Sequence, residues 1–97
     1  MNDFERAFEM SKQIKAQYPA GTRLVLNFMP DDPNPIEPGT RGTVAFVDDM
    51  GQIGMHWDNG RSLSLIPGVD SFRKLTEQEI ADEQKAASFE TVGPTLS

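Results

Sequence analysis

The sequence contains no cysteine among its 97 residues. Without thiols the chain forms no disulfide and no thiolate metal site, a composition that suits a reducing compartment. No apolar run approaches the ~20 residues that a membrane-spanning helix requires. The first ten residues carry acids among their apolar positions and lack the basic and apolar regions of a secretory signal. We therefore expect a cytoplasmic protein with no membrane association.

Basic charge is scarce. Nine Lys and Arg stand against fifteen Asp and Glu, a formal net charge of −6, and between positions 30 and 60 Arg41 is the only basic residue beside six acids. Non-specific affinity for nucleic acid requires clustered Lys or Arg, so the composition argues against DNA or RNA binding. A basic protein partner remains compatible, because complementary fields speed encounter.

The N-terminal segment, residues 1–18, has the pattern of an amphipathic helix. Asn2 and Glu5, three positions apart, form an N-cap pair, and Tyr18-Pro19-Ala20-Gly21 marks the end of the helix. Apolar residues fall three or four positions apart: Phe4, Ala7, Phe8, Ile14 and Tyr18. This face would serve equally to cover the chain's own barrel or that of a neighbouring copy, so the sequence is also compatible with a homo-oligomer.

Residues 19–75 show strand patterns separated by turns. Positions 22–29 alternate, with Leu24, Leu26 and Phe28 on one face, and the four prolines between positions 30 and 39 then require a stiff loop. In the next strand, positions 41–47, the apolar residues Val44, Phe46 and Val47 do not share one parity. Either a β-bulge shifts the register there or one of them faces outward.

Two further turns follow. Residues 48–51 turn the chain, positions 53–57 alternate, and Asn59-Gly60 has the chemistry of a type I′ hairpin turn. A fourth strand carries Leu63 and Leu65, a break follows at 67–70, and positions 72–75 form a fifth strand. Five short strands joined by tight turns predict a small β-barrel, so the fold class is mainly β, or α+β by content.

The C-terminal segment, residues 76–97, is predicted to be a short helix followed by a disordered tail from position 88. Thr76 and Glu79 make a capping box. The helix offers little apolar surface beyond Leu75 and Ile80, and a short helix needs a packed face, so we expect it to be weakly held. The three segments together make one domain.

No constellation of residues points to catalysis, to a cofactor or to a metal. The serines follow no nucleophile-elbow pattern, and no glycine-rich loop precedes a helix. His56 is the only histidine and lacks partners in the sequence pattern. The pairs Asp31-Asp32 and Asp48-Asp49 do not fit a calcium loop, and turn-forming aspartates explain them. We therefore expect a protein that is not an enzyme and holds neither cofactor nor metal.

The segment from about Tyr18 to Leu75 resembles a small bacterial and phage family, domain of unknown function 4314. The resemblance rests on blocks in fixed order: P-A-G-T-R-L-V-L, M-P-D-D-P, P-G-T-R-G-T-V, V-D-D-M-G-Q-I, W-D-N-G-R-S-L and I-P-G-V-D. It implies an SH3-like barrel and frequent occurrence on phage genomes and mobile elements. It brings no catalytic residue.

The function we expect is a protein-interaction module that uses the surface between the loop at 30–38 and the turn at 48–51. The candidate partner-binding residues are Asp31, Asp32, Phe46, Asp48, Asp49, Met50 and Trp57. The parity of Trp57 favours core packing, although strand curvature could present its indole edge to a ligand. Two alternatives are an acidic decoy that inhibits a host nucleic-acid-binding protein and a weak nucleic-acid-binding barrel.

Overall fold

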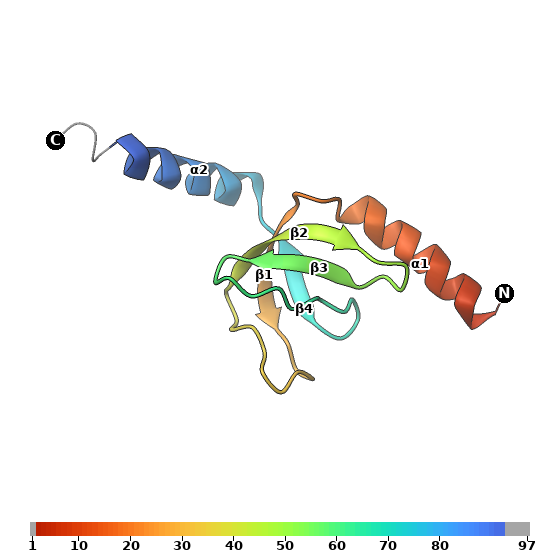
Figure 1. Cartoon of the computed structure of the whole chain (residues 1–97). Helices are drawn as coiled ribbons and strands as arrows, with labels where there is room; N and C mark the ends of the chain where they lie inside the picture. Colours follow the sequence, from red (N-terminus) through yellow and green to blue (C-terminus); the bar gives the residue numbers. More distant parts are fainter. Residues whose placement is uncertain (1, 93–97) are drawn as a thin grey trace.

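The computed structural model describes the backbone of residues 2–92 and the side chains of residues 2–87. Its elements in chain order are α1 Asp3–Gln17, β1 Arg23–Phe28, β2 Arg41–Val47, β3 Ile53–Trp57, β4 Ser71–Lys74 and α2 Glu77–Val92. The four strands form one antiparallel sheet in the order β3-β2-β1-β4 (Figure 1). The two helices leave opposite ends of the sheet. An antiparallel sheet with separate helices before and after it is an α+β fold.

The predicted closed barrel of five strands is not confirmed, because the described residues form four strands and the sheet stays open, with β3 and β4 at its edges. The expected fourth strand is reduced to a single bridge. Ile53 N–H donates to the Leu65 carbonyl at 2.9 Å and Leu65 N–H to the Ile53 carbonyl at 2.8 Å. Residues 61–64 beside this bridge run as an irregular segment along β3.

The turn before that segment differs from the predicted one. The Gly60 N–H donates to the Trp57 carbonyl at 2.9 Å. Within this turn only Gly60 has positive φ, at +90°. A type I′ turn would need positive φ at Asn59 as well, so the predicted turn type is wrong. The observed geometry is that of a type I turn followed by a left-handed glycine, which adds one residue to the loop and inserts a bulge. Beyond this turn the Trp57 N–H donates to the Arg61 carbonyl at 2.9 Å, and the chain next bridges to β3 at Leu65.

The hydrophobic core lies on the inner face of the sheet. It contains Leu24, Leu26, Val44, Ile53, Met55 and Trp57 from the strands and Met29, Ile36 and Leu65 from the loops. Trp57 is 3% exposed, and its Nε1 donates to the Leu63 carbonyl at 2.7 Å. Its ring packs over Gly42 on the neighbouring strand, where an added Cβ would lie 2.7 Å from Trp57 Cε3. Gly42 thus leaves the space that the indole fills.

Two register shifts decide which apolar residues reach that core. The pairing of β1 with β4 shifts between Leu26 and Phe28, so Phe28 faces solvent and Met29 takes the buried place that alternation assigned to Phe28. The pairing of β2 with β3 shifts between Val44 and Phe46. Both alternatives left open for this strand therefore hold, since a bulge is present and Phe46, 57% exposed, faces outward.

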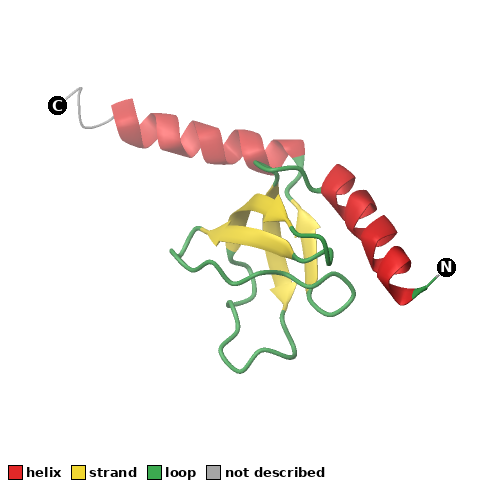
Figure 2. Cartoon of the chain, turned by 45° about the vertical axis from the view of Figure 1, so that its right-hand side comes forward, coloured by secondary structure: helices red, strands yellow, loops and turns green. Residues whose placement is uncertain are grey.

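Helix α1 forms as predicted and packs on its own sheet. Asn2 Oδ1 accepts from the Glu5 N–H at 2.8 Å, which caps the first turn. The C-terminal half docks through Ser11, which is fully buried, and Ile14, which contacts the turn at Gly51. The N-terminal half extends past the edge of the sheet (Figure 2).

Helix α2 begins with the predicted capping box, because the Thr76 N–H donates to Glu79 Oε1 at 2.9 Å and the Glu79 N–H donates to Thr76 Oγ1 at 3.1 Å. The helix continues to Val92 and so includes the first five residues of the stretch expected to be a tail. The rest of that stretch, 93–97, lies outside the described residues.

Ion pairs between arginines on the outer face of the sheet and glutamates on α2 hold the helix in place. Arg41 on β2 and Arg73 on β4 both pair across from Val25 on β1, so the two guanidinium groups flank one position. Arg73 binds the Glu79 carboxylate through both Nη atoms, at 2.7 and 3.0 Å. Arg41 Nη1 donates to Glu83 Oε1 at 3.1 Å.

Arg23 on β1 is the centre of this network. It binds both carboxylate oxygens of Asp58 at 2.7 and 2.8 Å and also donates to both oxygens of Glu83. These hydrogen bonds favour the charged forms, so the pKa of Arg23 is raised and the pKa values of Asp58 and Glu83 are lowered. Arg73 and the Thr76 N–H lower the pKa of Glu79 to about 2.

The buried indole generates the first prediction. Trp57→Phe leaves the Leu63 carbonyl without its donor and empties part of the volume above Gly42, so the free energy of unfolding should fall by about 2–3 kcal/mol. Urea unfolding followed by far-UV circular dichroism measures it. The matched control is His56→Gln, an exposed change on the same strand that should stay within ~0.5 kcal/mol of wild type. Equal stability of Trp57→Phe and wild type would contradict the core assignment.

The attachment of α2 gives the second prediction. Glu83→Gln removes the charge that Arg23 and Arg41 share, so the amides of residues 77–87 should exchange with deuterium several-fold faster while the sheet amides keep their rates. Glu77→Gln in the same helix is the control, since Glu77 makes no ion pair among the described residues. If both variants exchange alike, the ion pairs do not hold the helix.

The pH dependence of the same contact gives the third prediction. Because the pKa of Glu79 falls from 4.5 to about 2 in the folded protein, its stabilising effect is complete above pH 4.5 and is lost as the pH falls toward 2. Glu79→Gln keeps the capping box but removes the charge. The difference in thermal midpoint between wild type and Glu79→Gln should therefore be constant near neutral pH and narrow below pH 4.5. A difference that persists unchanged at pH 2 would show that charge is not its cause.

Candidate functional site

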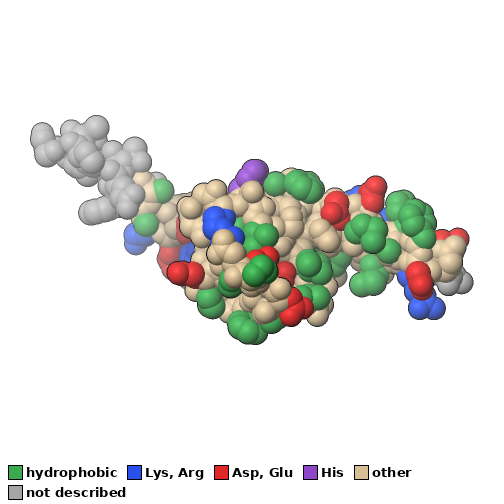
Figure 3. All heavy atoms as spheres, turned by 60° about the horizontal axis from the view of Figure 1, so that its bottom comes forward, with side chains coloured by type: hydrophobic (Ala, Val, Ile, Leu, Met, Phe, Trp, Pro, Cys, Tyr) green, Lys and Arg blue, Asp and Glu red, His purple; other side chains and the backbone are tan. Residues whose placement is uncertain are grey.

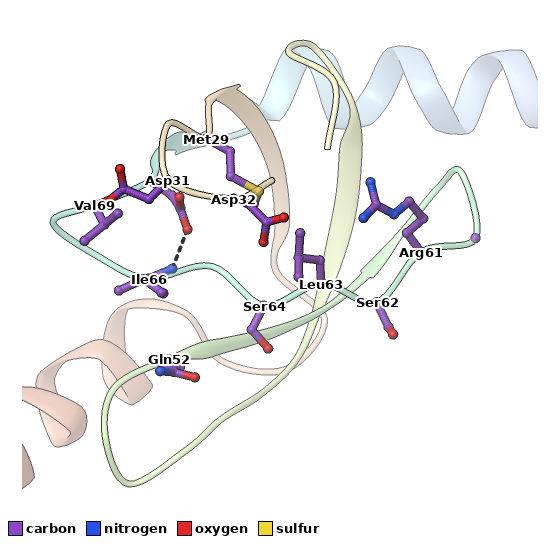
Figure 4. Close-up of a pocket in the computed structure, with 12 residues that line it drawn as sticks. Met29, Asp31, Asp32, Gln52, Arg61, Ser62, Leu63, Ser64, Ile66 and Val69 are labelled. Carbon is purple, nitrogen blue, oxygen red and sulfur yellow. Dashed lines mark hydrogen bonds between the residues drawn. The ribbon is translucent and has the colours of Figure 1, made fainter. Parts of the chain in front are cut away.

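A cavity of about 650 Å³ opens between the start of the proline-rich loop and the segment that leads from β3 to β4 (Figure 4). We call it the acidic cleft. It is lined by Met29, Asp31, Asp32, Gln52, Gly60, Arg61, Ser62, Leu63, Ser64, Ile66, Val69 and Asp70. The long loops that form it lie on the side of the sheet away from α2 (Figure 2).

Apolar side chains and free carboxylates stand close together in the acidic cleft. Ile66 and Val69 are 42% and 39% exposed at its rim. Asp31 has no hydrogen-bond or ion-pair partner among the residues that the structure describes. Asp32 uses one oxygen to accept from the Asn34 N–H at 2.8 Å. The acidic cleft therefore presents negative charge beside an apolar surface.

The walls of the acidic cleft are fixed by Arg61 and Asp70. Arg61 donates to the carbonyls of Asn34 and Pro35 at 2.7 and 3.0 Å and so ties the proline-rich loop to the segment after β3. Asp70 Oδ2 accepts from the Ile66 N–H at 2.8 Å, the contact marked in Figure 4. Among the described residues Arg61 donates to these carbonyls and forms no ion pair with Asp31, so the Asp31 carboxylate is open to a ligand.

The structure separates the candidate residues that the sequence grouped together. Only Asp31 and Asp32 line the acidic cleft. Trp57 lies in the core, and Phe46 lies on the outer face, where an added Cβ on Gly54 would meet its ring at less than 2.5 Å. Neither aromatic ring reaches the acidic cleft.

The remaining candidates belong to the turn between β2 and β3. Asp48 Oδ1 accepts from the N–H groups of Met50 and Gln52, each at 2.9 Å, and so stabilises the turn. Asp49 pairs with Lys15 of α1 at 3.0 Å. Met50 lies beside α1 rather than beside the proline-rich loop. The single surface expected between the loop at 30–38 and the turn at 48–51 is thus two separate surfaces, one at the acidic cleft and one beside α1.

Sequence reasoning missed the wall of the acidic cleft formed by residues 61–70. The sequence predicts a strand up to Leu65 and a break at 67–70, and it does not indicate that Ile66, Val69 and Asp70 line a cavity. No pattern in the sequence reveals that Arg61 reaches the proline-rich loop, because that contact joins positions 26 and 27 residues apart.

Within residues 2–92, no group of three or more His, Cys, Asp or Glu side chains is arranged to hold a metal ion. In the same part of the chain, no helix has the length and apolar character needed to cross a bilayer. No histidine lines the acidic cleft, since His56 lies on the outer face of the sheet opposite Thr43. The polar side chains of the acidic cleft are carboxylates, two serines, a glutamine and Arg61, which donates to carbonyls of the proline-rich loop.

Comparison with known sequences gives one result for the family and one for individual proteins. No curated protein matches the chain. The family model described as "Domain of unknown function (DUF4314)" matches residues 7–75, a span that contains all four strands, the acidic cleft and most of α1 but not α2. The chain belongs to the DUF4314 family.

Proposed function

We propose that this protein is a non-enzymatic interaction module that binds an extended, basic segment of a partner protein in the acidic cleft. The observation that carries the proposal is the unpaired carboxylate of Asp31 beside the exposed side chains of Ile66 and Val69 in a cavity of about 650 Å³. A charged hydrogen-bond acceptor next to apolar surface fits a lysine or arginine, whose aliphatic stem packs while its head group pairs.

The dimensions and construction of the acidic cleft support a peptide ligand. Its volume lies in the range of about 300–1,000 Å³ that is usual for binding pockets. Both walls are loops held by hydrogen bonds, through Arg61 on one side and Asp70 on the other. Binding to a wall already in place costs less ordering entropy than binding to a mobile loop.

The strand order supports an SH3-like arrangement for this module. The single bridge between Ile53 and Leu65 extends the sheet beyond β3, and the chain then returns to β4 at the opposite edge. A partly closed SH3-like barrel has this course, with the proline-rich loop and residues 66–70 beside each other at the binding face. On this view the protein acts in a phage or mobile-element setting, where a small module recruits one host protein.

The distribution of acidic side chains favours this function over charge mimicry. Asp58 is bound by Arg23, and Asp49 is bound by Lys15. A decoy for a nucleic-acid channel needs a continuous row of free carboxylates. The acids of positions 30–60 are instead partly neutralised within the chain, and the carboxylates of the proline-rich loop are split between Asp31 and Asp32 at its start and Glu37 at its end. A nucleic-acid-binding barrel receives no support, because Arg23, Arg41 and Arg73 are all occupied by carboxylates.

A selection from a random peptide library tests the proposal. Peptides retained by the wild-type protein should be enriched in Lys and Arg, and Asp31→Asn should weaken their binding roughly tenfold, since a charged pair becomes a neutral contact. Asp49→Asn is the matched control, an exposed aspartate away from the acidic cleft, and should bind as wild type does. The proposal fails if the retained peptides show no basic enrichment, or if Asp31→Asn and Asp49→Asn bind alike.

A further inference from the structure

A second exposed surface lies on α1 and the turn between β2 and β3, next to the acidic cleft. We call it the α1 patch, and it comprises Phe4, Phe8, Met10 and Met50, which are 76%, 42%, 59% and 67% exposed. Figure 3 shows hydrophobic side chains gathered at this end of the molecule. Monomeric proteins rarely leave several large apolar side chains exposed side by side.

Two hollows lie within the α1 patch, one on each side of Met50. One has a volume of about 230 Å³ and is lined by Phe4, Ala7, Phe8, Asp49 and Met50. The other, of about 210 Å³, has eight lining residues and shares two of them, Gln52 and Ile66, with the acidic cleft; the other six are Ala7, Met10, Ile14, Met50, Gly51 and Pro67. The described part of α2 leaves the other end of the sheet and does not cover these hollows (Figure 1).

We infer that the α1 patch is the interface of a two-fold symmetric dimer in which α1 packs antiparallel against α1 of a second copy. The charges along α1 favour an antiparallel second copy as the partner of the α1 patch. From positions 3 to 9 the helix carries three acids and one arginine, whereas from positions 10 to 17 it carries two lysines and no acid. An antiparallel pair sets each acidic half against a basic half, whereas a parallel pair sets like charges together.

The charged side chains nearest Phe8 define the register. Glu5 lies three residues before Phe8 and Lys12 four residues after it, so both adjoin Phe8 on the helix surface. Lys12 Nζ lies 4.7 Å from the centre of the Phe8 ring. A two-fold axis near Phe8 brings Glu5 of each copy beside Lys12 of the other. Both lysines also make an exposed ion pair within the chain, Lys12 with Glu9 at 3.6 Å and Lys15 with Asp49 at 3.0 Å. The longer pair of Lys12 leaves it the better placed of the two to contact a second copy.

Phe8 lines a hollow of the α1 patch and Asp31 lines only the acidic cleft, so variants of these two residues let the two proposals fail separately. Sedimentation equilibrium of the full chain at increasing concentration should show a monomer–dimer equilibrium. Phe8→Gln and Met50→Gln should each weaken dimerisation more than tenfold, since each change removes apolar contact twice per dimer. Phe46→Gln is the matched control: it removes an exposed phenylalanine from the outer face of the sheet and should leave the dimer unchanged. Asp31→Asn should also leave it unchanged.

A charge exchange tests the antiparallel register. Glu5→Lys and Lys12→Glu should each weaken the dimer roughly tenfold, because two like-charged contacts replace two opposite ones, and the double variant should restore wild-type affinity. Circular dichroism checks that each variant keeps its helices. The inference is overturned if the wild type remains monomeric throughout, if Phe46→Gln disrupts the dimer as much as Phe8→Gln, or if the double variant fails to recover.

Discussion

The packing of Trp57 over Gly42 is the contact on which the rest of the molecule depends. The indole fills the inner face of the sheet, and its Nε1 donates to the Leu63 carbonyl at 2.7 Å. That hydrogen bond draws the irregular segment after β3 against the core, although the segment has almost no strand pairing of its own. Leu63 and its neighbours form one wall of the acidic cleft. The wall of the acidic cleft therefore depends on a buried ring, together with the few backbone hydrogen bonds that join this segment to β3.

The two faces of the sheet are stabilised by different physics. The inner face buries aliphatic and aromatic side chains, and its contribution follows the apolar area removed from water. The outer face carries Arg23, Arg41 and Arg73, and α2 contacts it through carboxylates. Exposed ion pairs contribute little singly and more as bidentate networks. The core should thus be insensitive to salt, whereas the position of α2 depends on charge.

Much of the secondary structure could be predicted from the sequence, because it depends on local chemistry. The cap at Asn2, the capping box at Thr76 and the alternation of positions 53–57 all act within a few residues. The open sheet could not be predicted, since the alternation at Leu63 and Leu65 is the same for a paired strand and for a segment that bridges β3 only at Leu65. The turn type could not be predicted either, because the dipeptide Asn-Gly is compatible with both turn types. Of the seven candidate residues, Asp31 and Asp32 line the acidic cleft, whereas the long-range hydrogen bonds of Arg61 leave no signal in the local sequence.

The turn between β2 and β3 links the two exposed surfaces of the molecule. Asp48 stiffens it by accepting two backbone N–H groups, and Gly51 within it lies against Ser11 of α1. The same turn presents Met50 to the α1 patch and Gln52 to the acidic cleft. A dimer formed through the α1 patch would therefore hold two acidic clefts in a fixed relation, because each is tied to the interface by one rigid turn. Two fixed sites bind a partner that carries two basic segments far more tightly than either site alone, without any new contact. Weak individual binding by a small module is in this way compatible with firm attachment to its partner.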